Sequence, residues 1–230
     1  MAPASDGGYT LEPVDDLDPE PVREIQHIYE DGFAPHLRAD FGALTSERED
    51  GEIALALMHD GQPRGFAMLR PLGPTGWMFL RYFVAGQRGQ GLGGIMWDQL
   101  VAWLRADGYS LLVWDVEDPD EPGCDPAEVE IRNRRIRFYE RHGGRLLPVR
   151  GYGNPHDDAD GPRWTPMRLM AVPTAAGPSP VEAGYAAAIL GAVYRYRYEL
   201  DPGDPRVAAT EVTAGSAQAS RSRASDQEGV

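Results

Sequence analysis

A glycine-rich segment, residues 85–94 (AGQRGQGLGG), has the residue types and spacing that most directly indicate chemistry. Residues 77–84 before it are almost all apolar or aromatic, which predicts a strand. After it, apolar residues recur at the spacing of one helical face: Met96, Leu100, Trp103 and Leu104. Glycine leaves backbone N–H groups uncovered, and the positive end of the helix dipole strengthens their attraction for anions. The segment therefore predicts a strand–turn–helix site for a phosphorylated cofactor.

Two classes of phosphate-binding turn fit this segment less well. The nucleotide-triphosphate P-loop requires Gly-Lys-Ser/Thr, and the sequence contains no lysine. The dinucleotide pattern G-x-G-x-x-G is met by Gly89, Gly91 and Gly94, and Asp115 follows at about the usual offset of roughly 20 residues. However, residues 85–88 separate the strand from the first of these glycines, and too few strand-like runs follow to complete such a sheet. A dinucleotide-binding oxidoreductase is therefore the weaker alternative.

A second segment, residues 137–143 (RFYERHG), points to a third class. It resembles the FYE-x-x-G segment of the GNAT superfamily of N-acetyltransferases, and residues 88–93 (RGQGLG) fit that superfamily's R/Q-x-x-G-x-G/A signature. The resemblance extends over about residues 9–172. It implies an α/β (α+β) fold with a central mixed, mostly antiparallel sheet flanked by helices, to which this chain adds a C-terminal helix.

The resemblance also implies a donor site for acetyl-CoA, lying between the strands expected at 77–84 and 111–116. A backbone N–H near Phe83 or Val84 would hold the thioester carbonyl, and Tyr139 would protonate the departing CoA thiolate. The pyrophosphate would be bound by the glycine-rich segment, through Arg88, Gly89, Gln90, Gly91, Leu92, Gly93 and Gly94. An asparagine of the family is replaced here by Arg132, with Asn133 one place late. Arg132 is expected either to bind a phosphate or pantetheine carbonyl, or to lie on a solvated helix face.

The catalytic base is less well specified by the sequence. Some GNAT enzymes have a glutamate on the strand before the glycines, but here the only charged residue of that strand is Arg81. Asp115 and Glu117 at the end of the next strand are the candidates, and they share one face of it. The same two carboxylates are equally expected to hold the ammonium group of the acceptor, or to pair with arginines of the following helix.

Composition limits the class of substrate. The 230 residues have a formal net charge of −14, which argues against nucleic acid or an anionic membrane as a partner. It fits a small cationic amine, although an acidic surface is as often only solubilising. With one cysteine, Cys124, and no clustered histidines, the sequence predicts neither a disulfide nor a metal site. A cytoplasmic N-acetyltransferase is expected, with a homodimer left open; a non-catalytic CoA-binding module of the same fold is the alternative.

The expected organisation is a disordered start (1–8), an acetyltransferase domain (9–172), a linker with a further helix (173–200) and a disordered tail (201–230). Helices are predicted over residues 19–36, after the glycines, over 126–142 and over 181–200. Strands are predicted over 9–14, 53–58, 65–69, 77–84, 111–116, 145–152 and 164–172. An acidic loop containing His156, Asp157, Asp158 and Asp160 is expected between the last two strands. The C-terminal helix is expected to cover a sheet face or a dimer contact.

Overall fold

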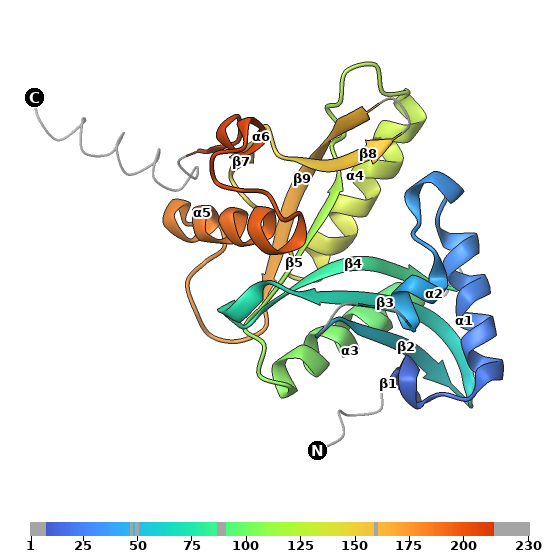
Figure 1. The fold of residues 1–230 in the computed structure, drawn as a ribbon. Coiled ribbons are helices and arrows are strands. Elements are labelled where there is room, and N and C mark those ends of the chain that lie inside the picture. Colours follow the sequence, from blue (N-terminus) through green and yellow to red (C-terminus); the bar gives the residue numbers. More distant parts are fainter. Residues whose placement is uncertain (1–7, 47, 49–50, 87–90, 159–160, 214–230) are drawn as a thin grey trace, which may run out of the picture. The chain divides into compact units, whose positions relative to one another are not determined.

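The computed structural model describes residues 8–46, 48, 51–86, 91–158 and 161–213 (Figure 1). The chain forms two compact units, Met1–Leu112 and Val113–Val230, and the boundary falls within strand β5 (Leu111–Glu117). The fold is the expected mixed α/β arrangement, in which mostly antiparallel strands are flanked by helices. The single domain expected over residues 9–172 stays a prediction.

The first unit follows the predicted order of one strand, one helix and three further strands. Its elements are β1 (Tyr9–Pro13), α1 (Pro19–Gly32), α2 (Phe41–Thr45), β2 (Ile53–His59), β3 (Gln62–Pro71), β4 (Trp77–Ala85) and α3 (Leu92–Ala106). The four strands pair antiparallel in the order β1-β2-β3-β4. A two-residue hairpin turn joins β2 and β3, in which Asp60 and Gly61 both adopt positive φ, 49° and 72°.

Helix α1 is shorter than the predicted helix over 19–36. It ends at Gly32, and Phe33 is already extended. Ala34 has a ψ of 148°, since a residue before proline avoids the helical region, and Pro35 then begins a short 3-10 helix (Pro35–Leu37). The pattern of apolar residues alone gave no signal for this early end.

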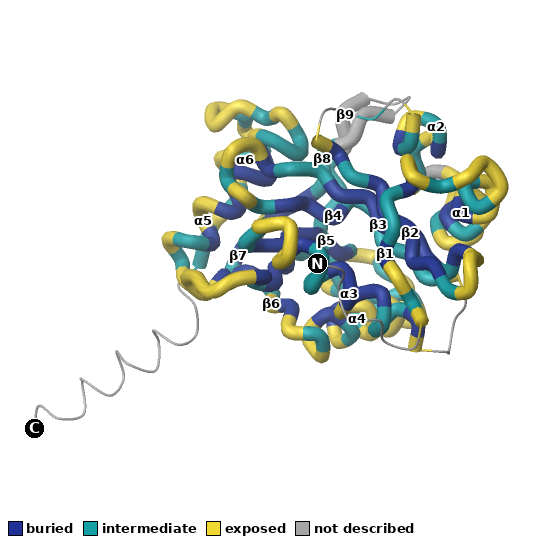
Figure 2. The backbone as a smooth tube through the Cα atoms, turned by 90° about the horizontal axis from the view of Figure 1, so that it is seen from below, coloured by how far each residue is buried: buried dark blue, intermediate teal, exposed yellow. Residues whose placement is uncertain are grey.

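The two central strands of the first unit, β2 and β3, are mostly buried, as their dark colour shows (Figure 2). Successive side chains of a strand point to opposite faces. Ala54 and Ala56 of β2 belong to one hydrophobic cluster with Ile25 and Tyr29 of α1. Leu55, between the two alanines, is equally buried on the other face. Helix α3 contacts β1, β3 and β4, so helices cover both faces of this sheet.

The second unit has short strands around one long strand. Its elements after β5 are α4 (Pro126–Arg141), β6 (Arg145–Leu146), β7 (Val149–Arg150), β8 (Gly153–Asp158), β9 (Gly161–Pro173), α5 (Ala183–Ala192), the π-helix η4 (Val193–Arg197), α6 (Pro205–Ala208) and β10 (Glu211–Val212). Strand β9 lies between β5 and β6 in the sheet order and also pairs antiparallel with β8. Strand β10 pairs antiparallel with β7.

Helix α4 has the ends that the sequence predicts. The Asp125 side chain accepts a hydrogen bond from the Ala127 N–H (2.8 Å), and Pro126 occupies the first turn. At the other end Gly143 adopts a φ of 86°, and the Gly144 N–H donates to the Tyr139 carbonyl at 2.9 Å. These contacts fix both ends of the helix that bears the expected proton donor.

Three expectations for the second unit are wrong. The strand predicted over 145–152 is broken into β6 and β7, because Pro148 lies between them and has no N–H to donate to a ladder. The acidic loop expected near residues 156–160 is instead a hairpin in which Asp158 pairs with Gly161; Asp160 lies outside the described residues. A backbone ladder forms regardless of side-chain polarity, so an acidic composition did not exclude a strand.

The third correction concerns the tail expected to be disordered from residue 201. Residues 205–208 form α6, and β10 pairs with β7 through Glu211 opposite Arg150 and Val212 opposite Val149. The C-terminal helix predicted over 181–200 is also shorter, because α5 changes to the π-helix η4 at Val193. The C-terminal segment is therefore part of the second unit, at least to residue 213.

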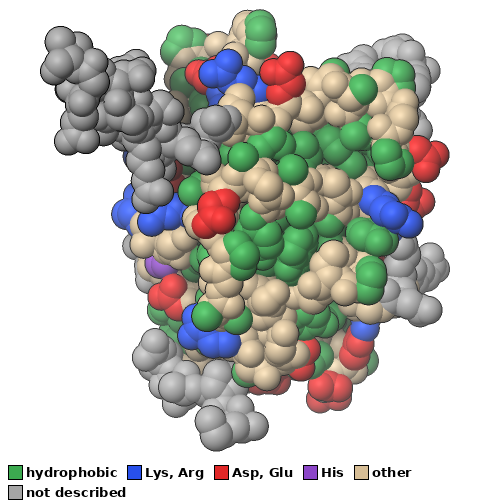
Figure 3. All heavy atoms as spheres, turned by 90° about the vertical axis from the view of Figure 1, so that its left-hand side faces the viewer, with side chains coloured by type: hydrophobic (Ala, Val, Ile, Leu, Met, Phe, Trp, Pro, Cys, Tyr) green, Lys and Arg blue, Asp and Glu red, His purple; other side chains and the backbone are tan. Residues whose placement is uncertain are grey.

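Hydrophobic side chains gather on the side of the molecule where α5 is drawn in Figure 1 (Figure 3). The exposed positions of α5 itself are small: Gly184, Ala187, Ala188 and Gly191. Its buried positions include Ile189 and Leu190, and the helix contacts β10. A dimer contact through this helix stays a prediction. None of the described helices is long and apolar enough to span a bilayer.

Candidate active site

The start of α3 has the backbone geometry expected of an anion site. Gly91 caps the helix in the left-handed region (φ 72°, ψ 2°) and provides no side-chain cap. Among the residues that the structure describes, no atom lies within 4 Å of a methyl group built on Gly91. The first N–H groups of a helix have no acceptor within the helix. Leu92, the first residue of the helix, is buried, with 2% exposure.

Only part of the predicted pyrophosphate turn can be placed. Arg88, Gly89 and Gln90 lie outside the described residues. Of the remaining residues, Gly91 is the cap, Leu92 begins the helix and Gly94 donates its N–H to the Gly91 carbonyl at 3.0 Å. Gly93 lies in the first turn. The described half of the turn thus agrees with an N-terminal helix site, and the ligand assignment stays a prediction.

Phe83 and Val84 lie on β4 opposite Ala67 and Phe66 of β3. The Phe83 ring packs edge-on against Trp97 of α3, with 5.6 Å between ring centroids, whereas Val84 packs against the cluster that contains α1. The register of β4 shifts between Tyr82, opposite Met68, and Leu80, opposite Leu69. Arg81 is therefore an additional residue, which makes a β-bulge just before the two predicted carbonyl-binding positions.

Arg81 at this bulge is bound to a buried carboxylate. Its Nη1 lies 2.6 Å from Oε1 of Glu52, whose side chain is only 1% exposed. Arg70 of β3 lies 3.8 Å from the same oxygen. An ion pair buried to this degree fixes the geometry of its strand, because separating the charges would leave one of them unpaired in the interior. No role for Arg81 was predicted from the sequence.

Tyr139, the expected proton donor, is a buried residue of α4. It has 7% exposure, and its ring centroid lies 4.9 Å from that of Trp114 on β5. Burial raises the pKa of the Tyr139 hydroxyl above the ordinary value, and the nearby Arg135 offsets this only in part. The phenol is therefore protonated at neutral pH, which is the state that an acid needs.

The two candidate bases, Asp115 and Glu117, have different surroundings although they lie two residues apart on β5. Glu117 is ion-paired with Arg135 of α4. Burial alone would raise the pKa of Glu117, but the charge of Arg135 and its hydrogen bond outweigh burial and lower it. This is the pairing with the following helix that the sequence left open, and it makes Glu117 the weaker base.

Asp115 has two phenols as partners. Its Oδ2 accepts hydrogen bonds from Tyr198 at 2.6 Å and from Tyr152 at 3.1 Å. Burial raises the pKa of Asp115, while the Tyr198 hydroxyl, the charge of Arg197 and the Tyr152 hydroxyl act in the opposite direction without cancelling the effect. Asp115 is thus a partly buried carboxylate with a raised pKa, a property typical of catalytic bases.

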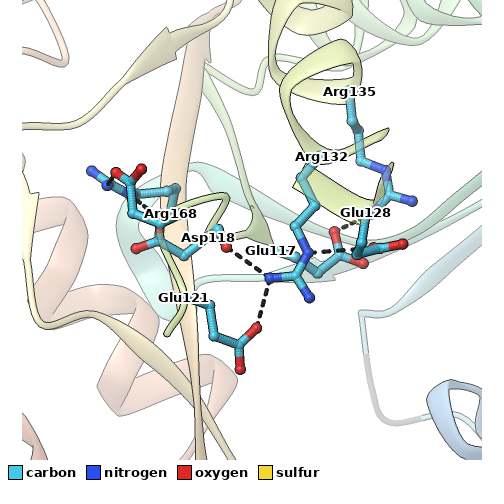
Figure 4. Close-up of polar contacts among 8 residues, drawn as sticks. Glu117, Asp118, Glu121, Glu128, Arg132, Arg135 and Arg168 are labelled. Carbon is cyan, nitrogen blue, oxygen red and sulfur yellow. Dashed lines mark hydrogen bonds and ion pairs between the residues drawn. The ribbon is translucent and has the colours of Figure 1, made fainter. Parts of the chain in front are cut away.

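Arg132 anchors a loop by its guanidinium (Figure 4). Its Nη1 donates to the Asp118 carbonyl at 2.7 Å and to Oε2 of Glu121 at 2.6 Å, and its Nε lies 3.3 Å from Glu128. The side chain is 13% exposed, so it is not on a solvated face. The phosphate or pantetheine contact of Arg132 stays a prediction. Asn133 beside it is partly buried.

Other acidic residues near the end of β5 also have arginine partners. Arg168 of β9 lies 2.9 Å from Asp118 and 2.6 Å from Asp120 (Figure 4). In contrast, the two side chains that hydrogen-bond Asp115 are neutral. Among the described residues there is no group of three or more histidine, cysteine, aspartate or glutamate side chains arranged to hold a metal ion.

Residues 20–143, more than half of the chain, match the family described as "Acetyltransferase (GNAT) family". This chain belongs to the GNAT family of acetyltransferases. The family assignment predicted from the sequence is confirmed, and so is the general class of enzyme, an acyl-CoA-dependent N-acyltransferase. The dinucleotide-binding alternative is wrong. No curated protein sequence matches the chain.

Solved GNAT structures resemble the fold at low sequence identity. A putative GNAT acetyltransferase from Bacteroides thetaiotaomicron is 18% identical, with a TM-score of 0.60 over 83% of this chain and 99% of that one. An aminoglycoside 6'-N-acetyltransferase complexed with coenzyme A is 17% identical, with a TM-score of 0.54 over 74% and 99%. The ribosomal-protein-S18-alanine N-acetyltransferase of Escherichia coli is 18% identical, with a TM-score of 0.51 over 74% and 97%.

The sequence analysis missed two residues of the candidate GNAT site, Tyr152 and Tyr198. Both lie beyond residue 143, where the family match ends. The alternation of tyrosine and arginine over residues 194–198 is unusual in the sequence, but no spacing rule connects it with Asp115. Only the folded chain brings the three side chains together.

Proposed function

We propose that this GNAT protein transfers the acetyl group of acetyl-CoA to a primary amine of a small cationic molecule. The observation that supports an amine acceptor most strongly is the kind of partner that binds the Asp115 carboxylate. Glu117, Asp118 and Asp120 are each matched by an arginine, whereas Asp115 is held by two phenols. Asp115 is therefore the carboxylate best suited to meet an ammonium group, and the acceptor's positive charge is expected to be recognised there.

The donor is proposed to bind through the backbone at the start of α3. The open space at Gly91 and the N–H groups of the first turn suit the oxygens of a pyrophosphate. One solved structure of similar fold contains coenzyme A, which agrees with acetyl-CoA as the donor. The remaining contacts proposed from the family motif are the N–H groups near Phe83 and Val84, for the thioester carbonyl.

Asp115 is proposed to take a proton from the acceptor, directly or through one water. An alkylamine with a pKa near that of lysine, about 10.4, is neutral only about once in 10³ molecules at pH 7, so it must be deprotonated before attack. The amine lone pair then forms the C–N bond to the thioester carbon. The C–S bond breaks, and the thiolate takes a proton that Tyr139 relays from the attacking nitrogen. The products are an acetamide and CoA thiol, and one proton per turnover is released to solvent.

Acceptor profiling tests this function. The enzyme is incubated with acetyl-CoA and a panel of diamines, aminoglycosides, amino acids and neutral amides, and products that gain one acetyl group are identified by mass spectrometry. We expect acetylated cationic amines, together with free CoA thiol in equal amount. Asp115→Asn serves as the control and should reduce turnover by about 10²-fold or more. Binding of acetyl-CoA without any acetylated product would instead indicate a non-catalytic CoA-binding module.

A further inference from the structure

The C-terminal segment, residues 183–213, packs on the rest of the second unit. The contacts described below are made by residues beyond position 143, where the family match ends. Strand β10 pairs with β7, and the Thr213 N–H donates to the Pro148 carbonyl at 2.7 Å. The Tyr194 and Thr210 hydroxyls lie 2.7 Å apart, which links the π-helix to the end of α6. The Tyr194 ring packs on Tyr152 with 5.6 Å between centroids. These contacts place the segment beside the Asp115 site of the same unit.

The local backbone of this segment is specialised at Tyr198. The N–H of Tyr198 donates to the carbonyl of Val193, five residues earlier, which is the hydrogen bond of a π turn. Such turns change the direction of the side chains that follow and occur often at functional sites. Glu199 then adopts a φ of 54°, a left-handed conformation uncommon for a non-glycine residue, and ends the helix. The helix therefore ends immediately after Tyr198.

The two phenols occupy one side of the Asp115 carboxylate. Tyr198 at 2.6 Å and Tyr152 at 3.1 Å both donate to Oδ2. Among the described residues, no hydrogen bond is made to Oδ1. A carboxylate whose one oxygen is fixed by two donors has a defined orientation, and its second oxygen remains to accept from a ligand.

We propose that Tyr198 of the C-terminal segment is a positioning residue for acetyl transfer: with Tyr152 it holds Oδ2 of Asp115, so that Oδ1 is directed to the acceptor amine. The proposal rests on the proposed function of Asp115. It gives the C-terminal segment a direct part in the reaction, beyond covering the second unit. The alternative is that Tyr198 only anchors the segment, as the hydroxyl of Tyr194 does.

The two roles differ in their dependence on pH. Besides the two phenols, the charge of Arg197 lowers the pKa of Asp115 and the charge of Glu117 raises it. Both phenols stabilise the ionised carboxylate, so removing one hydroxyl raises the pKa of Asp115 further. The ascending limb of kcat/KM against pH reports the base in the free enzyme and therefore shifts to higher pH. A hydrogen bond to a charged group corresponds to about one to two pH units. If Tyr198 only anchors the segment, removing its hydroxyl lowers the stability of the protein but does not shift the ascending limb of kcat/KM.

The experiment compares Tyr198→Phe with Tyr194→Phe in the full-length protein. We expect Tyr198→Phe to shift the ascending limb upward by about one pH unit or more and to raise the acceptor's KM, with the KM of acetyl-CoA unchanged. Tyr194→Phe removes the contact with Thr210 and should lower the melting temperature without moving the limb. Tyr152→Phe, which has the longer hydrogen bond, should shift the limb in the same direction by less.

A second readout separates failure of this inference from failure of the proposed function. The Asp115 carboxyl is titrated by ¹³C NMR in the wild type and in Tyr198→Phe, which requires no turnover. A raised pKa together with an equal shift of the activity limb supports the inference. A raised pKa with an unmoved activity limb, or an unchanged pKa, overturns it while leaving acetyl transfer intact. Absence of acetyl transfer by the wild type overturns the function itself, and with it the role of Tyr198.

Discussion

Glu117 of β5 forms an ion pair with Arg135 of α4, whereas Asp115, two residues earlier on the same strand, is bound by phenols of Tyr152 and Tyr198. The sequence places the two carboxylates on one strand and cannot distinguish them. Their surroundings distinguish them. The charge of Arg135 lowers the pKa of Glu117, whereas burial raises the pKa of Asp115. The ion pair therefore indicates a structural role for Glu117, and Asp115 stays the proposed base.

Glu117→Gln is expected to retain activity and to alter stability in acid. The substitution removes a partly exposed ion pair, so the free energy of unfolding should fall by about 1 kcal/mol or less at pH 7, and kcat should stay within a few-fold of wild type. Because the folded state lowers the pKa of Glu117 below its ordinary 4.5, the wild-type pair stabilises above that pH and loses its effect as pH falls further. Urea denaturation at several pH values should show the two proteins converging in acid.

Gly91→Asp should abolish stabilisation by acetyl-CoA. The substitution puts a carboxylate in the open space at the start of α3, where pyrophosphate is proposed to bind. Gly108→Asp is the matched control, because Gly108 follows the same helix, has a φ of 88°, and would also place a Cβ in open space. Each left-handed site should lose about 1–2 kcal/mol from strain. At 100 times the Kd, acetyl-CoA should stabilise the wild type and the control by about 2.7 kcal/mol; an equal shift for Gly91→Asp would exclude this site.

Glu52→Gln should be the most destabilising of these changes. It leaves the guanidinium groups of Arg81 and Arg70, which have 16% and 11% exposure, without their shared buried carboxylate. Breaking a buried ion pair by removing one partner lowers the free energy of unfolding by about 3–5 kcal/mol. Glu30→Gln is the control: the Glu30 side chain makes a solvent-exposed hydrogen bond with Gln26, and its change should lower the free energy of unfolding by about 0.5 kcal/mol at most. Similar midpoints for the two variants in chemical denaturation would contradict a structural role for Glu52.

Local signals predicted most elements and one part of the site. A continuous apolar run identifies β2, turn residues identify the hairpin after it, and capping residues identify α4, since each signal depends on neighbours in the sequence. The family motif identifies the glycine turn and Tyr139 for the same reason. The pairing of Glu52 with Arg81 joins residues 29 positions apart, and that of Asp115 with Tyr198 joins residues 83 apart. Such contacts depend on tertiary packing, which a single sequence does not encode in any spacing.

Tyr139→Phe should lower kcat and leave binding and folding nearly unchanged. The ring that packs 4.9 Å from Trp114 is kept, so the stability of α4 against β5 should be preserved. Burial raises the pKa of the Tyr139 hydroxyl, which makes it a reluctant acid; the proton transfer is favourable only if the thiolate, with an ordinary thiol pKa of about 8.5, is poorly solvated where it forms.

General acid catalysis contributes about 10²–10⁴-fold, so kcat for Tyr139→Phe should fall by at least the lower figure. Single-turnover kinetics at saturating acetyl-CoA isolates the chemical step. Tyr185→Phe removes another phenol hydroxyl of the second unit that takes part in no proposed step, and it should react at the wild-type rate. A donor with a better leaving thiol offers a sharper check. An acyl thioester of a more acidic thiol needs less protonation, so the defect of Tyr139→Phe should shrink with that donor. A defect that is equal for both donors would mean that Tyr139 packs against Trp114 and does not protonate the thiolate.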